Sequence, residues 1–214
     1  MTTKQRALSD IRWSLFSAIK IVAIGALQLS LLAQVLGESE FDMLATSIIM
    51  LLVLDTLCDR GFSNKIIRRH ILNHRQQSTL YWFNILSGLA FFAVFFIGGN
   101  IIGRFSGQPD LALMIEMLSL VFIIIPQGQH YRAILQKEKH FSRLALTETA
   151  AVITGLTATL VTVWLSPSIF SAIWGYLAMV SVRMIMFCCY GREYFQAQFI
   201  FDMKSLSALR HSKI

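Results

Sequence analysis

The feature that most constrains this chain is a series of long apolar stretches. Each is about 20 residues long, the length an α-helix needs to cross roughly 30 Å of hydrocarbon at about 1.5 Å per residue. The stretches are continuously apolar, so they predict helices and not the alternating strands of a β-barrel. Hydrophobic residues make up 55% of the 214 residues and charged residues 14%, which is typical of a chain surrounded by lipid.

The sequence predicts an all-α transmembrane bundle of six helices. A cytoplasmic N-terminus at 1–10 precedes the bundle at 11–190, and a basic cytoplasmic tail at 191–214 follows it. The first apolar run is longer than a signal-peptide core, so we expect an uncleaved span. Short polar or turn-forming segments separate the spans, which predicts antiparallel neighbours. The expected spans are 11–36, 41–57, 80–102, 111–130, 144–165 and 169–190.

The basic residues predict the orientation of the bundle. If both termini are cytoplasmic, every Lys and Arg of the 19 lies on the cytoplasmic side except Arg104, outside, and Lys20, within the membrane. Cytoplasmic loops of membrane proteins carry such an excess of positive charge. The net charge of +7 therefore follows from topology, and nucleic-acid binding is not needed to explain it.

Ionisable residues at membrane depth are costly, so they are candidate functional groups. Lys20 lies about 12 Å into the first span, counted from Arg12, and either faces a cavity or a partner, or snorkels toward water. Asp55 and Asp59 are four residues apart near the cytoplasmic end of the second span, so they share a helix face. Arg60 and Lys20 are candidate partners for these carboxylates, while Asp59 and Arg60 are also compatible with an interfacial loop.

A second group of candidates lies in the later spans. Glu148 could pair with Lys20 or Arg132, or lie at the interface. We expect Glu116 and Arg183, near opposite ends of spans four and six, to reach water. Pro126 is expected to end or kink the fourth span, and the polar residues after it, His130 included, to leave the membrane or line a wet cavity. A solvated cytoplasmic His130 is the favoured interpretation.

No pattern in the sequence indicates an enzyme or a cofactor. It contains no glycine-rich phosphate loop, no zinc-binding His-Glu helix face and no nucleophile with a nearby base. Cys58, Cys188 and Cys189 lie near the cytoplasmic ends of spans, where we expect neither a disulfide nor a metal site.

Several stretches together resemble the N-terminal half of polysaccharide flippases of the Wzx type. This group belongs to the multidrug/oligosaccharidyl-lipid/polysaccharide exporter superfamily, and the colanic-acid exporters are the nearest branch. The most specific match begins at Arg132 and runs to Glu148. The matching stretches are Leu36–Phe41, Asp59–Ile67, Arg132–Gln136, Phe141–Ala145 with Glu148, and Ala172–Gly175.

The resemblance implies a half-transporter that handles a lipid-linked sugar. Members move undecaprenyl-diphosphate-linked oligosaccharide from the cytoplasmic to the outer face of the bacterial inner membrane by alternating access between two six-helix halves. In such a transporter, the depth and position of Lys20 and Arg60 make them the candidates to hold the diphosphate. Asp55, Asp59, Arg132 and Glu148 are the candidates for a charge network or for coupling to an ion gradient. This chain would pair with a second half or with itself. The alternative is a truncated or accessory membrane protein of polysaccharide biosynthesis that does not transport.

Overall fold

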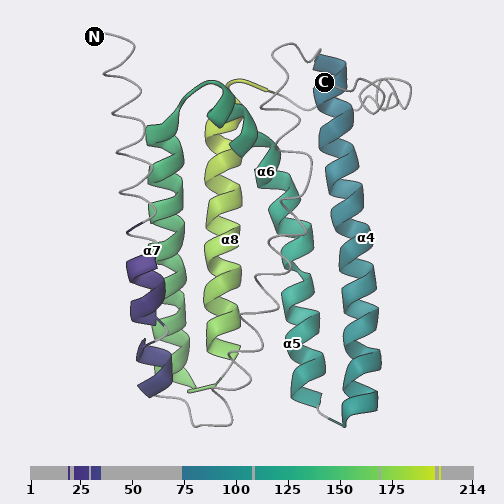
Figure 1. Cartoon of the computed structure of the whole chain (residues 1–214), viewed down its shortest axis with the longest axis vertical. Coiled ribbons are helices and arrows are strands. Elements are labelled where there is room, and N and C mark those ends of the chain that lie inside the picture. The colour runs from purple at the N-terminus through teal and green to yellow at the C-terminus, as the bar shows by residue number, and fades with distance from the viewer. Residues whose placement is uncertain are drawn as a thin grey trace.

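The computed structural model describes residues 19, 22–28, 30–34, 74–107, 109–168, 170–195 and 198. Every regular element in these ranges is a helix (Figure 1). Four are long and apolar enough to cross a membrane, Arg75–Phe105, Pro109–Lys137, Phe141–Leu165 and Phe170–Gly191. The elements are α4 (His74–Ser106), α5 (Pro109–Ser119), α6 (Val121–Lys137), α7 (Phe141–Leu165) and α8 (Phe170–Gly191).

These helices overlap the four later spans expected from the sequence. The rod formed by α5 and α6 covers the expected span 111–130 and continues to Lys137, while α7 and α8 begin and end within a few residues of 144–165 and 169–190. Most of the expected spans 11–36 and 41–57 lies outside the described residues. The helical residues 22–28 and 30–34 belong to the first of them.

The long helices lie side by side, and each runs opposite to the one before it in the chain, so the neighbouring α6 and α8 run in the same direction (Figure 1). The helix α8 packs against both α6 and α7, α4 packs against α5 and α6, and α6 packs only lightly on α7. We name the end at which α4 and α7 begin and α6 and α8 end the basic end, at the top of Figure 1. Of the Lys and Arg residues in the described ranges, all but Arg104 lie toward this end.

The turns between the helices follow from their residues. Gly107 has φ +68° between α4 and α5, a conformation that glycine adopts without the clash of a Cβ. Lys139, in the turn between α6 and α7, has φ +60°. Ser166 ends α7, and its amide donates to Thr162 O at 2.9 Å. Short turns of this kind join antiparallel helices, as the sequence predicts.

Of the two outcomes expected at Pro126, an end or a kink, the end does not occur, because the helix continues for eleven residues to Lys137. Proline cannot donate to the carbonyl four residues back, here Phe122. The freed carbonyl lies against Gly88 of α4, where an added Cβ would overlap both Phe122 O and the proline ring. Asn84, also on α4, donates to Pro126 O at 3.1 Å. Close packing against α4 therefore supports the helix where its own ladder is interrupted.

Small residues bring α7 and α8 together. A Cβ added to Gly175 on α8 would overlap Thr159 Oγ1 and lie 2.8 Å from Gly155 O, both on α7. Thr159 Oγ1 donates to Gly155 O at 2.9 Å and accepts from Gln28 Nε2 at 2.9 Å. Apolar burial gives little gain between helices that already lie in lipid, so close contact and hydrogen bonds of this kind hold them together.

Candidate functional site

Three charged side chains from three helices meet below the basic end. Arg132 lies five residues before the end of α6, Glu148 seven residues after the start of α7, and Arg183 eight residues before the end of α8. At about 1.5 Å per residue, these positions are roughly 8 to 12 Å from the helix ends. The three residues form what we call the charge cluster.

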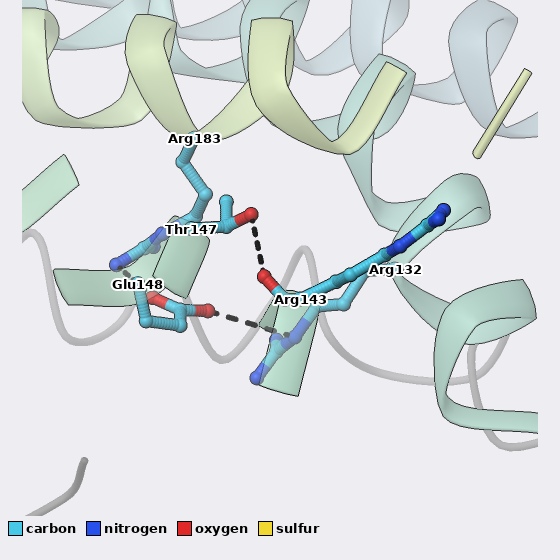
Figure 2. Close-up of polar contacts among 5 residues, drawn as sticks. All are labelled: Arg132, Arg143, Thr147, Glu148 and Arg183. Carbon is cyan, nitrogen blue, oxygen red and sulfur yellow. Dashed lines mark hydrogen bonds and ion pairs between the residues drawn. The ribbon is translucent and has the colours of Figure 1, made fainter. Parts of the chain in front are cut away.

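Glu148 is the central member of the charge cluster. Its Oε2 lies 2.9 Å from Arg183 Nη2, and its Oε1 lies 3.8 Å from Arg132 Nε. The exposed fractions are 15% for the Glu148 side chain, 22% for Arg183 and 37% for Arg132. Figure 2 shows the carboxylate between Arg183, which extends from α8, and Arg132. One carboxylate thus links α6, α7 and α8.

The electrostatics of the charge cluster explain why the three residues come together. An isolated charge at the centre of a membrane helix costs about 2.5 to 3.5 kcal/mol on insertion scales, and pairing Glu148 with Arg183 removes much of that cost. The pairing is incomplete, because two guanidinium groups share one carboxylate and leave one positive charge in excess. Arg183 Nε is also buried without a hydrogen-bond partner among the described residues.

A second ion pair lies nearer the end of the helices. Arg143 Nη1 is 2.7 Å from Glu193 Oε2, and the Arg143 guanidinium carbon lies 5.5 Å and 5.9 Å from the ring centres of Tyr190 and Tyr194. Both members of the ion pair are solvent-accessible, at 34% and 60% exposed. The Arg143 side chain therefore turns to Tyr190, Glu193 and Tyr194 at the end of α8. Its carbonyl accepts from Thr147 Oγ1 at 2.9 Å within α7 (Figure 2).

The expectation that His130 is solvated was wrong. Its side chain is 2% exposed and its ring centre lies 4.8 Å from Phe195 and 5.4 Å from Tyr81. Phe195, itself buried, follows α8, and Gln198 further on accepts from Trp82 Nε1 of α4 at 3.0 Å. The segment after α8 therefore returns across the bundle and covers His130.

The structure brings together two of the residues predicted from the sequence, Arg132 and Glu148. The other candidates, Lys20, Asp55, Asp59 and Arg60, lie outside the described residues. Arg183 was expected to reach water, but it makes the shorter ion pair with Glu148. Its position eight residues inside α8 is the same signal of depth that singled out Lys20, and could have identified it.

The chemistry available in the charge cluster is charge pairing and anion binding. Two guanidinium groups supply donors, and the carboxylate supplies an acceptor that could exchange a proton or a cation. Within the ranges that the structure describes, no group of three or more His, Cys, Asp or Glu residues is placed to hold a metal ion. Cys188 and Cys189 are free thiols.

Comparisons with known proteins place these features in a family. Residues 31–211 match the family model described as polysaccharide biosynthesis protein. The chain is 34% identical over 207 residues to the lipopolysaccharide biosynthesis protein WzxC of Escherichia coli K12. The matched region covers 97% of this chain and 42% of WzxC. It is 34% identical over 195 residues to an uncharacterized membrane protein in the cps region of Klebsiella pneumoniae, covering 91% of this chain and 40% of that protein.

A more distant relative is the teichuronic acid biosynthesis protein TuaB of Bacillus subtilis, 26% identical over 204 residues, with 95% of this chain and 42% of TuaB covered. No solved structure matches the chain. The chain spans about two fifths of the length of these relatives. With its membrane-length helices, it is a multi-pass protein of the bacterial inner membrane, and it belongs to the polysaccharide biosynthesis protein family.

Proposed function

We propose that this chain is a component of a transporter that moves lipid-linked oligosaccharide, a polysaccharide precursor, from the cytoplasmic to the outer face of the bacterial inner membrane. Family membership and the likeness to WzxC support a role in polysaccharide export. Alternating access between two helical halves is the mechanism we propose, since transporters built from paired bundles commonly work in this way.

The observation that carries the proposal is the charge cluster, which lies roughly 8 to 12 Å inside the ends of three membrane-length helices. A bundle that served only as a scaffold would be more stable with apolar residues at these positions, because replacing buried ion pairs by well-packed apolar residues is often neutral or stabilising. Ionisable residues inside membrane segments mark pathways for substrates, ions and protons. We assign Arg132 and Glu148 to a charge network that couples transport to an ion gradient, together with Asp55 and Asp59.

The substrate diphosphate is assigned to Lys20 and Arg60. Ammonium and guanidinium groups bind phosphate oxygens well. The sequence positions Lys20 in the cytoplasmic half of the first expected span and Arg60 just beyond the cytoplasmic end of the second. We further propose six spans with both termini in the cytoplasm, so that the basic end is the cytoplasmic end. In that orientation the substrate would be taken up on the side where the basic residues gather.

The partner proposed for this bundle is a second half-transporter or a second copy of the chain. A central cavity between two bundles needs both, and the relatives are more than twice as long as the matched region. Membrane lipid and the undecaprenyl-diphosphate-linked oligosaccharide are the remaining partners of the proposal.

Complementation tests the proposed function. The chain is expressed alone and with a candidate second half in cells that lack their exopolysaccharide flippase, and surface polysaccharide is measured at matched protein amounts in the membrane. We expect rescue by at least one assembly, and loss of rescue in the Lys20→Ala, Arg60→Ala and Glu148→Gln variants.

Arg104→Ala is the control, because it removes a basic residue at the end of the bundle opposite the charge cluster. Rescue should survive that change. If no assembly restores surface polysaccharide while the protein is stable in the membrane, the transport proposal is wrong and an accessory role in polysaccharide biosynthesis takes its place. If Lys20→Ala and Arg60→Ala transport normally, the assignment of the diphosphate to these residues is wrong.

A further inference from the structure

The segment after α8 crosses the basic end and joins two helices that have few contacts of their own. In Figure 1, α8 and α6 lie between α7 and α4, and among the described helices α4 packs mainly on α5 and α6. Residues 192–195 and 198, which we call the clasp, contact both the start of α7 and the first turns of α4. The clasp is therefore a direct connection between α7 and α4 at this end.

The attachment of the clasp to α7 is polar and exposed. Glu193 Oε2 lies 2.7 Å from Arg143 Nη1, and the Tyr194 hydroxyl lies 2.7 Å from His140 Nε2, just before α7 begins. The Glu193 side chain is 60% exposed and Tyr194 is 40% exposed. Exposed polar contacts of this kind fix a position but add little stability.

The attachment of the clasp to α4 depends on one buried side chain and one backbone unit. Of the clasp residues, Phe195 alone is buried, and its ring centre lies 6.4 Å from that of Tyr81 on α4. The amide of Gln198 donates to Ser78 Oγ at 3.3 Å, and its carbonyl accepts from Trp82 Nε1 at 3.0 Å. Both hydrogen bonds can break without disturbing the backbone ladder of α4.

Phe195 also fills the space between three helices. It belongs to a buried cluster that contains Leu80 of α4, Tyr131 of α6 and Phe187 of α8. Removing its ring would leave a void between α4 and the other two helices, where the packing contacts of the cluster would be lost. A segment with one buried side chain is also the kind of element that opens locally while the helices stay folded.

We propose that the clasp is a releasable lock at the basic end. With Phe195 in its site, the clasp holds the start of α4 against α6 and α8. When Phe195 leaves, α4 pivots about its close contact with α6 at Gly88, about 21 Å from the start of α4, and moves away from α7 at the basic end. His130, which Phe195 covers, then becomes exposed to water. The inference rests on the clasp contacts and not on transport, so it can fail while the proposed function stands.

Distances between spin labels on the purified full chain in detergent test this lock. Labels at Arg75→Cys and Ser142→Cys report the separation of α4 and α7 at the basic end, and both positions are exposed. We expect Phe195→Ala to add a population in which this distance is longer by about 5 Å, the scale of one helical turn. Every variant carries alanine in place of the native cysteines Cys58, Cys188 and Cys189.

Phe105→Ala is the matched control, because it makes the same change at a side chain that is 90% exposed at the opposite end. It should leave the distance within about 1 Å of the wild type. A second pair of labels, at Ile101 and Leu165, reports the separation of the same two helices at that opposite end. We expect this second distance to stay unchanged in Phe195→Ala.

Trp82→Phe decides the matter if circular dichroism shows that Phe195→Ala has lost helix content. It removes the donor to Gln198 O and keeps the Phe195 ring, so we expect the same longer distance in a smaller fraction of molecules. An unchanged distance at the basic end in the folded variants would overturn the proposal. Equal lengthening at both ends would also overturn it, since that result would show a general loosening of the bundle.

Discussion

The two ends of the described bundle are held together in different ways. At the basic end, charged side chains link the helices through the pairs Glu148–Arg183 and Arg143–Glu193. At the opposite end, the helices meet through small residues, and a Cβ added to Gly103 of α4 would overlap the Cβ of Ala112 of α5. Arg104, the basic residue described there, is exposed and forms no ion pair with another described residue.

This difference reflects where each kind of interaction is effective. Between helices in lipid, association depends on close backbone approach and interhelical hydrogen bonds, which the Gly155, Thr159 and Gly175 contacts provide. A charge pair contributes most to stability where little water surrounds it, because the effective dielectric constant is low there. The charge cluster lies between the apolar middle of the helices and their exposed ends. We therefore expect its disruption to lower the free energy of unfolding more than the loss of a charge at either exposed end.

The largest effect is expected from Glu148→Gln. The change leaves Arg132 and Arg183 facing each other without a carboxylate, and breaking a buried pair from one side commonly costs 3 to 5 kcal/mol. Because the side chains are partly exposed, we expect a free energy of unfolding lower by about 3 kcal/mol. The measurement is denaturant unfolding in detergent followed by circular dichroism.

The matched control for that experiment is Arg104→Gln, which should change the free energy of unfolding by less than about 0.5 kcal/mol. Equal losses in the two variants would remove the distinction between the ends.

A somewhat smaller effect is expected from Gly175→Ala, which tests the close contact between α7 and α8. The new methyl group would overlap Thr159 Oγ1 and crowd Gly155 O, so we expect a loss of about 2 kcal/mol from overpacking. The control is Gly98→Ala on α4, where an added Cβ meets no atom within 4 Å. It should be neutral or slightly stabilising, since alanine favours helix formation over glycine. If both changes behaved alike in unfolding experiments, close contact between α7 and α8 would not be a source of stability.

The smallest effect is expected from Glu193→Gln, which removes the exposed ion pair with Arg143. Exposed pairs contribute about 0.2 to 1 kcal/mol and are screened by salt. We expect a small loss in the free energy of unfolding at low ionic strength that disappears at high salt. The loss from Glu148→Gln should persist at high salt, because partly buried charges are screened less. A salt-independent loss for Glu193→Gln would show that the two ion pairs do not differ in kind.

Much of the helical architecture could be predicted from hydropathy. The four later spans are long and apolar, and the turns at Gly107 and Ser166 occur where glycine, proline and serine interrupt them. The contacts that support α6 at Pro126 could not be predicted, because they come from Gly88 and Asn84 of α4. His130 was misassigned for a similar reason, since Phe195 and Tyr81, distant in sequence, cover it.

The charge cluster was only partly predictable. The position of Glu148 inside its predicted span marks it as a charge that is costly in lipid. Arg132 was one of the two basic residues predicted as its partner. The choice of Arg183 as the nearer partner depends on which face of α8 packs against α7, and that face also carries the close contact of Gly175 with Gly155 and Thr159. A sequence pattern gives the depth of a charge in a helix, but the facing helix decides which partner it meets.

The pairing of Glu148 with Arg183 is the central interaction of the charge cluster, and a double-mutant cycle measures its strength. The free energies of unfolding of Glu148→Gln, Arg183→Gln and the double variant are compared with that of the wild type at two salt concentrations. We predict a coupling energy of about 2 kcal/mol, so that the double variant is more stable than the sum of the single losses implies. Additivity within about 0.5 kcal/mol would contradict the account.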